Sequence, residues 1–193
     1  MKEDLILAGV GGQGILSIAT IIGKAALGQG LYLKQAEVHG MSQRGGDVQS
    51  HLRLSDKPID SDLIPHGQCD LIVSLEPMEA LRYLPWLSKD GWIITNTNPF
   101  VNIPDYPGME EVKKALAATG NVVAFDADGI AKGMQSPRSA NMVLLGATAA
   151  KLGILKPELL REGIRSIFAR KGEAVVEVNL KAFDAGLKEA GYE

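Results

Sequence analysis

Apolar and polar positions follow two alternating periods over the first two thirds of the chain, one of two residues and one that is helical. Short apolar or strictly alternating runs indicate β-strands. They lie at residues 4–8, 31–38, 47–54, 70–75, 92–95 and 122–125. The run at 70–75 (DLIVSL) is apolar through its middle, which is typical of a central parallel strand. Residues 47–54 alternate instead, which predicts an antiparallel strand at a sheet edge with one face in water.

Segments with a period near 3.6 residues separate and follow these runs, and they predict helices. They lie at residues 12–29, 76–84, 109–118, 139–152, 156–169 and 173–190. After Asp126 the pattern is helical only. This order predicts the α/β class, as a three-layer α/β/α sandwich with a mostly parallel sheet and a helical C-terminal third. We expect a single domain over residues 1–193, because no linker or repeat divides the chain.

The composition narrows the choice of partners. Basic and acidic side chains, 20 and 23 of them, are mixed along the chain and leave a formal net charge of −3. No cluster of Lys and Arg offers the positive surface that a nucleic-acid backbone needs, so we expect no nucleic-acid partner. The N-terminus lacks the features of a signal peptide, and no apolar run approaches the about 18 residues of a membrane span. The sequence therefore predicts a cytoplasmic protein without a membrane segment.

The single cysteine, Cys69, sets a further limit. One thiol cannot form an internal disulfide, nor can it hold an iron–sulfur cluster, which takes about four thiolates. Cys69 flanks an apolar strand and is expected to be a small core residue. His39, His51 and His66 show no metal-ligand spacing, so the chain is predicted to carry no metal site.

A glycine-rich loop follows the first predicted strand. In the string GVGGQG, Gly9, Gly11 and Gly14 match the G-x-G-x-x-G spacing of dinucleotide-binding domains. Such glycines allow a tight turn, close approach of a phosphate to backbone N–H groups, and close packing of a helix on a strand. In a nicotinamide or flavin enzyme, Glu37 near the end of the second strand would hold the ribose. The alternative is that the glycines serve only to pack the helix tightly on the sheet.

The segment after the second strand departs from a dinucleotide-binding fold. Residues 38–47 form a polar, glycine-rich stretch where a crossover helix would be expected. Because loops that follow the first two strands emerge at one sheet edge, Gln13 and Arg44 should face one cleft. Arg44, beside two glycines, suits a phosphate or a carboxylate, although a surface or interface ion pair explains it equally well. His39 is either a general acid or base or, more commonly for a lone histidine, a hydrogen-bonding structural residue.

Several ordered motifs resemble a known family. They are GVGGQGI near the N-terminus, then AEVHGMSQRGGDVQSHLRLSD, then IPHGQCDLIVSLEPMEALRYL, and finally NMVLLGA at 141–147. Together they look like the gamma subunit, or gamma domain, of 2-oxoacid:ferredoxin oxidoreductases, within the branch that oxidises indolepyruvate or related aryl pyruvates. The resemblance covers nearly the whole chain, and the matching order and spacing make it far more specific than the glycine pattern alone.

The resemblance implies a subunit of an enzyme that oxidatively decarboxylates a 2-oxoacid with coenzyme A, giving acyl-CoA, carbon dioxide and reduced ferredoxin. It also implies thiamine diphosphate and [4Fe-4S] clusters on a large catalytic partner subunit, with ferredoxin reached through the complex. The sequence agrees, because it has no G-D-G…N-N thiamine signature: the string DADGI at 126–130 lacks the first glycine. We therefore expect a small subunit that binds no cofactor alone and is inactive alone.

By the same resemblance, two loops and one helix start supply the candidate site. The matching positions are Gly9, Gly11, Gly12, Gln13 and Gly14 in the first loop, Ser42, Gln43, Arg44, Gly45 and Gly46 in the second, and Asn141. We expect them in the wall of a shared cleft near thiamine diphosphate and coenzyme A, or in the subunit contact beside it. No catalytic residue is assigned. Glu76, just before Pro77, is expected to be a first-turn helix acid.

Two other classes of function also fit the residues. A nicotinamide- or flavin-binding Rossmann protein would bind a dinucleotide by itself and use Glu37. A non-catalytic nucleotide-binding module would bind its ligand with no turnover. The oxidoreductase subunit would instead be colourless and inactive without a large protein partner. The three hypotheses therefore differ in what the isolated chain binds.

Overall fold

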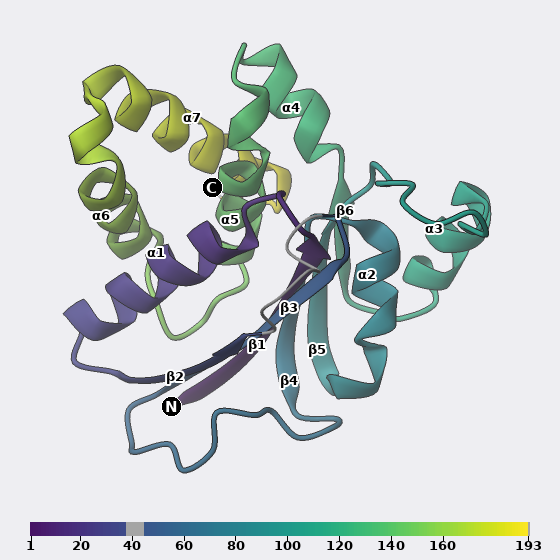
Figure 1. Ribbon diagram of the computed structural model, residues 1–193. Helices are drawn as coiled ribbons and strands as arrows, with labels where there is room; N and C mark the ends of the chain where they lie inside the picture. Colours follow the sequence, from purple (N-terminus) through teal and green to yellow (C-terminus); the bar gives the residue numbers. More distant parts are fainter. Residues whose placement is uncertain (38–44, 193) are drawn as a thin grey trace.

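The computed structural model describes residues 1–37 and 45–192, and these residues form an α/β fold (Figure 1). Within them, a six-stranded sheet has the order β2-β3-β1-β4-β5-β6. The strands are β1 (Lys2–Val10), β2 (Tyr32–Glu37), β3 (Asp47–Ser55), β4 (Cys69–Ser74), β5 (Leu87–Asn96) and β6 (Val122–Phe125). Each strand lies on one of the predicted runs, so these predictions are confirmed.

The helices also follow the predicted segments. They are α1 (Ile15–Gly28), α2 (Pro77–Arg82), α3 (Met109–Ala117), α4 (Ala127–Gly133), α5 (Ala140–Ala149), α6 (Pro157–Phe168) and α7 (Glu173–Glu189), with 3-10 helices η2 (Leu84–Trp86), η3 (Pro137–Ser139) and η4 (Ala169–Lys171). Every predicted helix is found, but the pattern did not predict α4. Asp126 starts α4 by accepting a hydrogen bond from the Gly129 N–H at 2.6 Å. The helix is too short for its period to show in the sequence.

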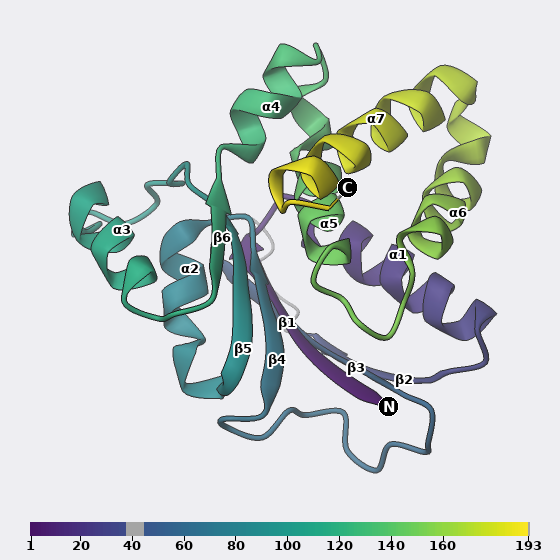
Figure 2. The ribbon, with the colours of Figure 1, turned by 180° about the vertical axis from the view of Figure 1, so that it is seen from behind.

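Helices cover both faces of the sheet, as Figures 1 and 2 show from opposite sides. Helices α1, α5, α6 and α7 lie over one face, and α2 and α3 lie over the other. The larger apolar core includes Leu5 and Leu7 of β1 with Phe183 of α7. Ile6, the residue between those two leucines, belongs to the smaller core on the opposite face. Because successive strand residues point to opposite faces, one apolar strand serves both cores. The predicted three-layer sandwich is confirmed.

Strand β3 is where the sheet differs from the prediction. Strands β1, β4, β5 and β6 pair in parallel, and β3 runs antiparallel to both β1 and β2. The antiparallel direction is confirmed, but the edge position is wrong, because β2 pairs outside β3 and forms the edge. The wet face is wrong as well. His51 is only 6% exposed, because residues 56–68 bind to His51 and Arg53 on that face.

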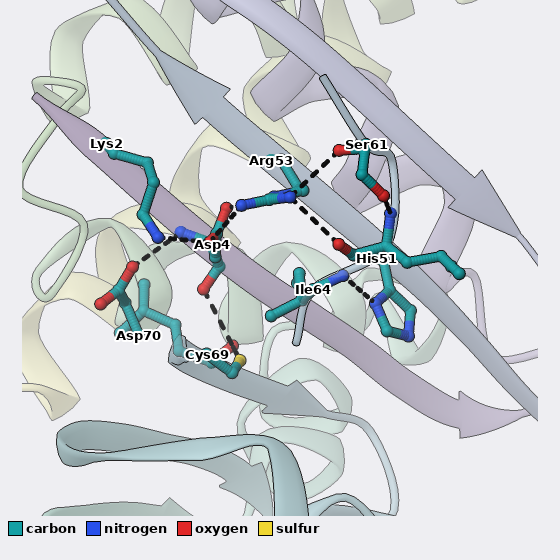
Figure 3. A network of polar contacts seen from close by, with 10 residues as sticks. Lys2, Asp4, His51, Arg53, Ser61, Ile64, Cys69 and Asp70 are labelled. Atoms are coloured by element: carbon teal, nitrogen blue, oxygen red, sulfur yellow. Dashed lines mark hydrogen bonds and ion pairs between the residues drawn. The ribbon is translucent and has the colours of Figure 1, made fainter. Parts of the chain in front are cut away.

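Buried charges fasten the amino edge of the sheet (Figure 3). Asp4 of β1 is 0% exposed, and Arg53 of β3 donates to both oxygens of its carboxylate, at 2.8 and 3.1 Å. Arg53 Nη1 also donates to the carbonyl oxygens of Ser61 and Leu63, at 3.1 and 3.0 Å. A buried carboxylate is tolerated here because each of its oxygens receives a charged donor. The pair therefore ties β1, β3 and the 56–68 segment together.

Helices α5 and α7 approach each other more closely than ordinary side chains allow. A Cβ at Gly146 would lie 1.9 Å from the Phe183 carbonyl oxygen, and one at Gly186 would lie 1.8 Å from the carbonyl oxygen of Val143. Glycine at both positions therefore lets the two backbones touch. This contact holds the helical C-terminal third against α5, whose side chains fill the larger core.

Cys69 lies at the start of β4 and is buried, as predicted for a small core residue. Burial raises the pKa of its thiol to about 12. In residues 1–37 and 45–192, no group of three or more His, Cys, Asp or Glu side chains is placed to hold a metal ion. No helix in that part of the chain is long and apolar enough to cross a membrane.

Candidate functional site

The first glycine loop, residues 9–14, joins the end of β1 to the start of α1 (Figure 1). Gly12 and Gly14 have φ angles of 103° and 87°, a left-handed backbone that favours glycine. A Cβ at Gly14 would also lie 2.6 Å from Asn141 Nδ2. Gly14 is the N-cap of α1, where no side chain caps the helix and no acid lies in the first turn. The loop thus brings N–H groups of the first turn to the carboxyl edge of the sheet.

Gln13 joins the ends of two neighbouring strands. Its Oε1 accepts a hydrogen bond from the Val10 N–H at 2.7 Å, and its Nε2 donates to the Leu75 carbonyl oxygen at 3.2 Å. Val10 ends β1, and Leu75 follows the last residue of β4. Both ends of the Gln13 side chain are therefore used within the chain, and its role in the loop is to hold these strand ends together.

A pocket of ≈ 400 Å³ opens beside this bridge, with Gln13, Leu75, Asp128 and Asn141 in its walls. The chain leaves β1 toward α1 on one face of the sheet and leaves β4 toward α2 on the other (Figures 1 and 2). In open α/β sheets, ligands bind at such a switch point, outside the carboxyl ends of the strands. The pocket therefore lies where this fold class binds small molecules.

Arg138 also lines this pocket, and sequence reasoning missed it. Its side chain is exposed, and it makes no hydrogen bond or ion pair with the described part of the chain. Arg138 belongs to the 3-10 turn that leads into α5, three residues before Asn141. One turn of helix thus brings a cation and the predicted amide to the same pocket. The signal available in the sequence was this spacing, next to the recognised NMVLLGA motif.

A second pocket, of ≈ 280 Å³, lies on the other side of the glycine loop. Gly11, Gly12, Leu16 and Gln49 are among its lining residues. The Oε1 atom of Gln49 is buried and has no hydrogen-bond partner among the described residues. The glycine loop is therefore a thin wall between two hollows, and both hollows contain polar groups.

The second glycine loop meets the first one. The Gly11 N–H donates to the Gly46 carbonyl oxygen at 2.9 Å, and Gly45 has a φ angle of 93°. Asn102 Nδ2 donates to the Gly45 carbonyl oxygen at 3.0 Å. The expected meeting of the two loops at one edge is thus found for their described residues. The other predicted residues of this loop lie outside the described residues: His39, Ser42, Gln43 and Arg44.

Two asparagine side chains, one at the start of a helix and one at the end of a strand, hold the other loops of the carboxyl edge together. Asn141, in the first turn of α5, donates to the Gly14 carbonyl oxygen at 3.2 Å. Asn96, at the end of β5 and 1% exposed, donates to the Leu75 carbonyl oxygen at 3.3 Å and to Asp128 Oδ2 at 2.9 Å. Sequence reasoning missed Asn96 and Asp128. The available signal was a run of polar residues, TNTN at 95–98, directly after an apolar strand.

Glu76 anchors a neighbouring loop, residues 97–108. It is 1% exposed and is the N-cap of α2, since its Oε2 accepts from the Glu79 N–H at 2.8 Å. Its Oε1 accepts from the Phe100 N–H at 3.3 Å and from the Tyr106 hydroxyl. Burial, together with the Glu76 carboxylate, raises the pKa of Tyr106. Glu76 is thus one position earlier than the predicted first-turn acid, and it positions the loop that reaches Gly45.

The position of Glu37 weakens the dinucleotide hypothesis. Glu37 ends β2, and β3 lies between β2 and β1. A ribose-binding acid in a Rossmann fold ends the strand next to the glycine loop. Here an inserted strand adds about 5 Å, the usual spacing between neighbouring strands. The loop and the acid therefore do not have the neighbouring arrangement that a dinucleotide site uses.

Comparison with known proteins places the chain in a family. The model of the pyruvate ferredoxin/flavodoxin oxidoreductase family matches residues 4–189. The indolepyruvate oxidoreductase subunit IorB of Pyrococcus horikoshii is 40% identical, over 98% of this chain and 97% of its own length. The same-named subunit of Methanothermobacter thermautotrophicus is 37% identical, over 96% of each chain. The 2-oxoglutarate synthase subunit KorC of that organism is 31% identical, over 96% of this chain and 94% of its own length.

Solved structures show the same fold. The gamma subunit of a keto/oxoacid ferredoxin oxidoreductase from Geobacter sulfurreducens has a TM-score of 0.73 and 29% identity, and the match covers 98% of this chain and 97% of that one. A 2-oxoglutarate:ferredoxin oxidoreductase from Magnetococcus marinus has a TM-score of 0.76 and 24% identity, over 98% of this chain but 31% of that one. The same fold thus occurs both as a separate subunit and as part of a longer chain.

These matches define the class of protein as an oxidoreductase subunit of the gamma type. The chain belongs to the pyruvate ferredoxin/flavodoxin oxidoreductase family. The resemblance found in the sequence is confirmed, and the match favours this hypothesis over both nucleotide-binding alternatives.

Proposed function

We propose that the chain is the small subunit of a thiamine-diphosphate-dependent 2-oxoacid:ferredoxin oxidoreductase that acts on indolepyruvate or a related aryl pyruvate. The complete enzyme converts the 2-oxoacid and coenzyme A to acyl-CoA and carbon dioxide. The two electrons released pass singly to two ferredoxins. Similarity to indolepyruvate oxidoreductase subunits over nearly the whole length of both chains carries this proposal.

The iron–sulfur clusters and the thiamine diphosphate are assigned to a large catalytic partner subunit. A [4Fe-4S] cluster takes about four thiolates. This chain has one cysteine, which is buried at the start of β4 with a pKa raised to about 12. Its residues therefore do not fit a cluster, and no electron-transfer step is assigned to them. Ferredoxin would receive its electrons from the partner subunit.

The contribution of this chain would be one wall of the active-site cleft. The glycine loop and Arg138 line the ≈ 400 Å³ pocket at the carboxyl edge. Backbone N–H groups at a helix start and a guanidinium suit an anionic group, such as a phosphate of coenzyme A. The 2-oxoglutarate:ferredoxin oxidoreductase of Magnetococcus marinus is described with coenzyme A and succinyl-CoA bound, which supports this ligand class. Gln13 and Asn141 would keep the wall in shape.

The partner subunit would cover the same edge. Phe100, Val101 and Ile103 are 46%, 66% and 40% exposed, and all three belong to the loop that Glu76 anchors. Clustered exposed apolar side chains are a feature of protein–protein contacts. This loop contacts Gly45 through Asn102, so a partner seated on it would border the glycine loops. The thiamine of the partner would then face the pocket of this chain.

Co-expression with the catalytic subunit tests the proposal. The complex should reduce ferredoxin, or methyl viologen in its place, in a reaction that needs both coenzyme A and a 2-oxoacid. Either subunit alone should be inactive. Indolepyruvate and phenylpyruvate should give higher kcat/KM than pyruvate or 2-oxoglutarate. Activity of the isolated chain would contradict the proposed division of roles between the subunits. A complex that uses only pyruvate or 2-oxoglutarate would contradict the proposed substrate.

A binding assay separates the proposal from the dinucleotide alternative. Isothermal titration of the isolated chain with NAD, NADP and FAD should show no micromolar binding. Low-micromolar affinity that falls in Glu37→Ala would instead favour the Rossmann hypothesis. The cytoplasmic location expected from the sequence stays a prediction.

A further inference from the structure

The 56–68 segment connects β3 to β4 at the amino edge of the sheet, opposite the glycine loops. It has no helix or strand of its own. Near its two ends the Asp56 N–H donates to the Met1 carbonyl oxygen and the Gly67 N–H donates to the Pro85 carbonyl oxygen, both at 3.0 Å, and side chains of the sheet hold the residues between. Arg53 donates to two of its carbonyl oxygens, and Lys34 of β2 donates to that of Asp60 at 3.2 Å. The attachment at Ile64 depends on an imidazole: the Ile64 N–H donates to Nδ1 of His51 at 3.0 Å (Figure 3).

The His51 bond fixes the protonation state of the ring. Nδ1 can accept a hydrogen bond only when it carries no proton, so the attached segment requires a neutral His51. The ring is 6% exposed and meets Trp86 edge-on, with ring centroids 6.2 Å apart and planes at 86°. His66, in the segment itself, contacts Trp86 at 4.3 Å. The ring is thus enclosed between β3, the segment and the 3-10 turn η2.

Charged groups around His51 oppose one another. Burial is the largest influence and lowers the pKa of His51 below its ordinary value. Asp62 of the segment and Asp4 of β1 act to raise it, while Arg53 on the same strand lowers it. Asp4 is itself held by Arg53, which limits how far its charge can stabilise an imidazolium. The surroundings therefore agree with the geometry in favouring the neutral ring.

We propose that His51 is an acid-sensitive latch on the 56–68 segment. Protonation at Nδ1 replaces the acceptor of the Ile64 N–H by a second donor, so the two groups repel and the part of the segment around Ile64 separates from the sheet. Ile64 is 3% exposed and shares the smaller apolar core with Ile6 and Cys69. Release would therefore bring water to a core that the segment normally covers, while Arg53 and Lys34 keep the segment near the sheet. The proposal does not depend on the function proposed above.

The direction of the pH dependence follows from linkage. In the released state His51 is solvated and titrates near its ordinary pKa of about 6.5. In the attached state the pKa is lower, so release takes up a proton anywhere between these two values. The ratio of released to attached molecules should then rise up to about tenfold per pH unit below 6.5 and stay constant above it. The attachment is complete at neutral pH and is lost as the pH falls.

Amide hydrogen exchange measures this ratio directly. The protection factor of the Ile64 N–H, corrected for the intrinsic pH dependence of exchange, should fall up to about tenfold per pH unit below 6.5. Amides in the middle of β1 should keep their protection over the same range. Equal losses at Ile64 and in β1 would mean global acid unfolding and would overturn the proposal, as would a pH-independent Ile64.

Two matched variants identify the responsible ring. In His51→Asn, the amide oxygen can take the place of Nδ1 without titrating, so the protection of Ile64 should no longer depend on pH. In His66→Asn, a histidine that contacts the same Trp86 is removed without loss of a bond to the segment, so the parent behaviour should persist. The opposite pattern, or the parent behaviour in both variants, rejects the latch. His51→Gln replaces His51→Asn if the latter does not fold.

The single thiol provides a second measurement on the parent chain. Because Cys69 is the one cysteine, labelling by 4,4′-dithiodipyridine, which reacts at acid pH, reports on a single site. Its labelling rate relative to a free thiol should rise below pH 6.5 in the parent and in His66→Asn, but not in His51→Asn. A relative rate that stays flat in the parent contradicts release of the segment from the core.

Discussion

The two edges of the sheet differ in whether their polar side chains have partners within the protein. At the amino edge, Asp4 is buried and both of its oxygens accept from Arg53, whose Nη1 also donates to the carbonyl oxygens of Ser61 and Leu63, so this charge pair is fully used within the chain. At the carboxyl edge, Gln13 and Asn141 bind only the protein backbone, while Arg138 and Gln49 Oε1 have no partner in the described residues. Polar groups left without partners beside a fixed loop therefore indicate a binding edge, whereas a charge cluster with every carboxylate oxygen occupied indicates a structural one.

The largest expected effect is at the amino edge. Asp4→Ala leaves the Arg53 guanidinium, which is only 12% exposed, without its carboxylate, and breaking a buried pair in this way costs about 3–5 kcal/mol. Urea denaturation should therefore show a loss of this size in the free energy of unfolding. The control is Asp184→Ala, which removes an exposed pair with Arg161 at 2.8 Å and should cost less than about 1 kcal/mol. Equal losses for the two variants would mean that the amino edge is not a structural centre.

Arg138→Ala tests the other half of the comparison. Its loss should leave the free energy of unfolding within about 0.5 kcal/mol, because an exposed, unpaired side chain contributes little. Turnover of the reconstituted complex should fall about tenfold to a hundredfold, since a charge-assisted bidentate contact contributes about 1.5–3 kcal/mol. A higher KM for coenzyme A would indicate the phosphate, and weaker co-purification would indicate the partner subunit. Arg165→Ala, an exposed arginine of α6, is the control and should change neither quantity.

Arg44, which was predicted as a site residue from the sequence, can be tested in the same way as Arg138. Arg44→Ala should behave like Arg138→Ala, with a stable fold and reduced turnover. Arg44→Lys should recover only part of the loss, because an ammonium group cannot make a two-pronged contact. Parent-like turnover of the Arg44→Ala complex would exclude that residue from the site and leave Arg138 as the candidate cation.

Gly14→Ala should have an intermediate effect, on both stability and turnover. An L-residue at a φ angle of 87° costs about 1–2 kcal/mol, and the new methyl group would meet Asn141. Asn141→Ala added to Gly14→Ala should relieve the contact and return part of the stability, which a double-mutant cycle measures. Gly28→Ala, where a Cβ meets nothing within 4 Å, is the control and should be neutral or slightly stabilising. Additive effects of the two mutations would mean that Gly14 and Asn141 do not touch.

The smallest expected effect concerns Glu3 at the amino edge. Burial raises the pKa of Glu3, although the N–H groups of Gly153 and Ile154 bind its carboxylate. A raised folded-state pKa stabilises the fold below the ordinary value near 4.5, and this contribution is lost as the pH rises through the folded-state pKa. The stability of the parent relative to Glu3→Gln should therefore decrease over that interval and then level off. A relative stability that increases with pH would mean that folding lowers the pKa of Glu3, contrary to this prediction.

Local sequence patterns predicted the positions of the helices and strands along the chain better than the order of the strands in the sheet. The strands and most helices were predicted correctly because the alternation of strands and the period of helices are local properties of the chain. The place of β3 was missed, because the pairing of β2 outside β3 is decided by a hairpin and by the cover that residues 56–68 provide. Helix α4 was missed because it is too short to show a period and depends on the Asp126 cap.

The candidate site also has features that the sequence could predict and features that it could not. The two glycine loops were predictable, because loops after the first two strands were expected at the carboxyl edge of the sheet. The contacts of Asn96 with Leu75 and Asp128 were not, since they depend on which strand ends become neighbours. Arg138 was overlooked for a different reason: its neighbours in the sequence do not reveal that it lines the pocket without an ion pair to any described residue.

The hydrogen bond from Gly11 to Gly46 has a consequence for the entropy of binding. Loops usually lose conformational freedom when a ligand arrives, and this loss weakens the measured affinity. Here Asn141 holds the first loop at Gly14, and Asn102 holds the second at Gly45, before any ligand is present. At these described positions the ordering has therefore occurred during folding. A ligand at this edge should bind with a smaller entropic penalty than free glycine loops would impose, and calorimetry of an Asn102→Ala complex would record the difference as a less favourable binding entropy.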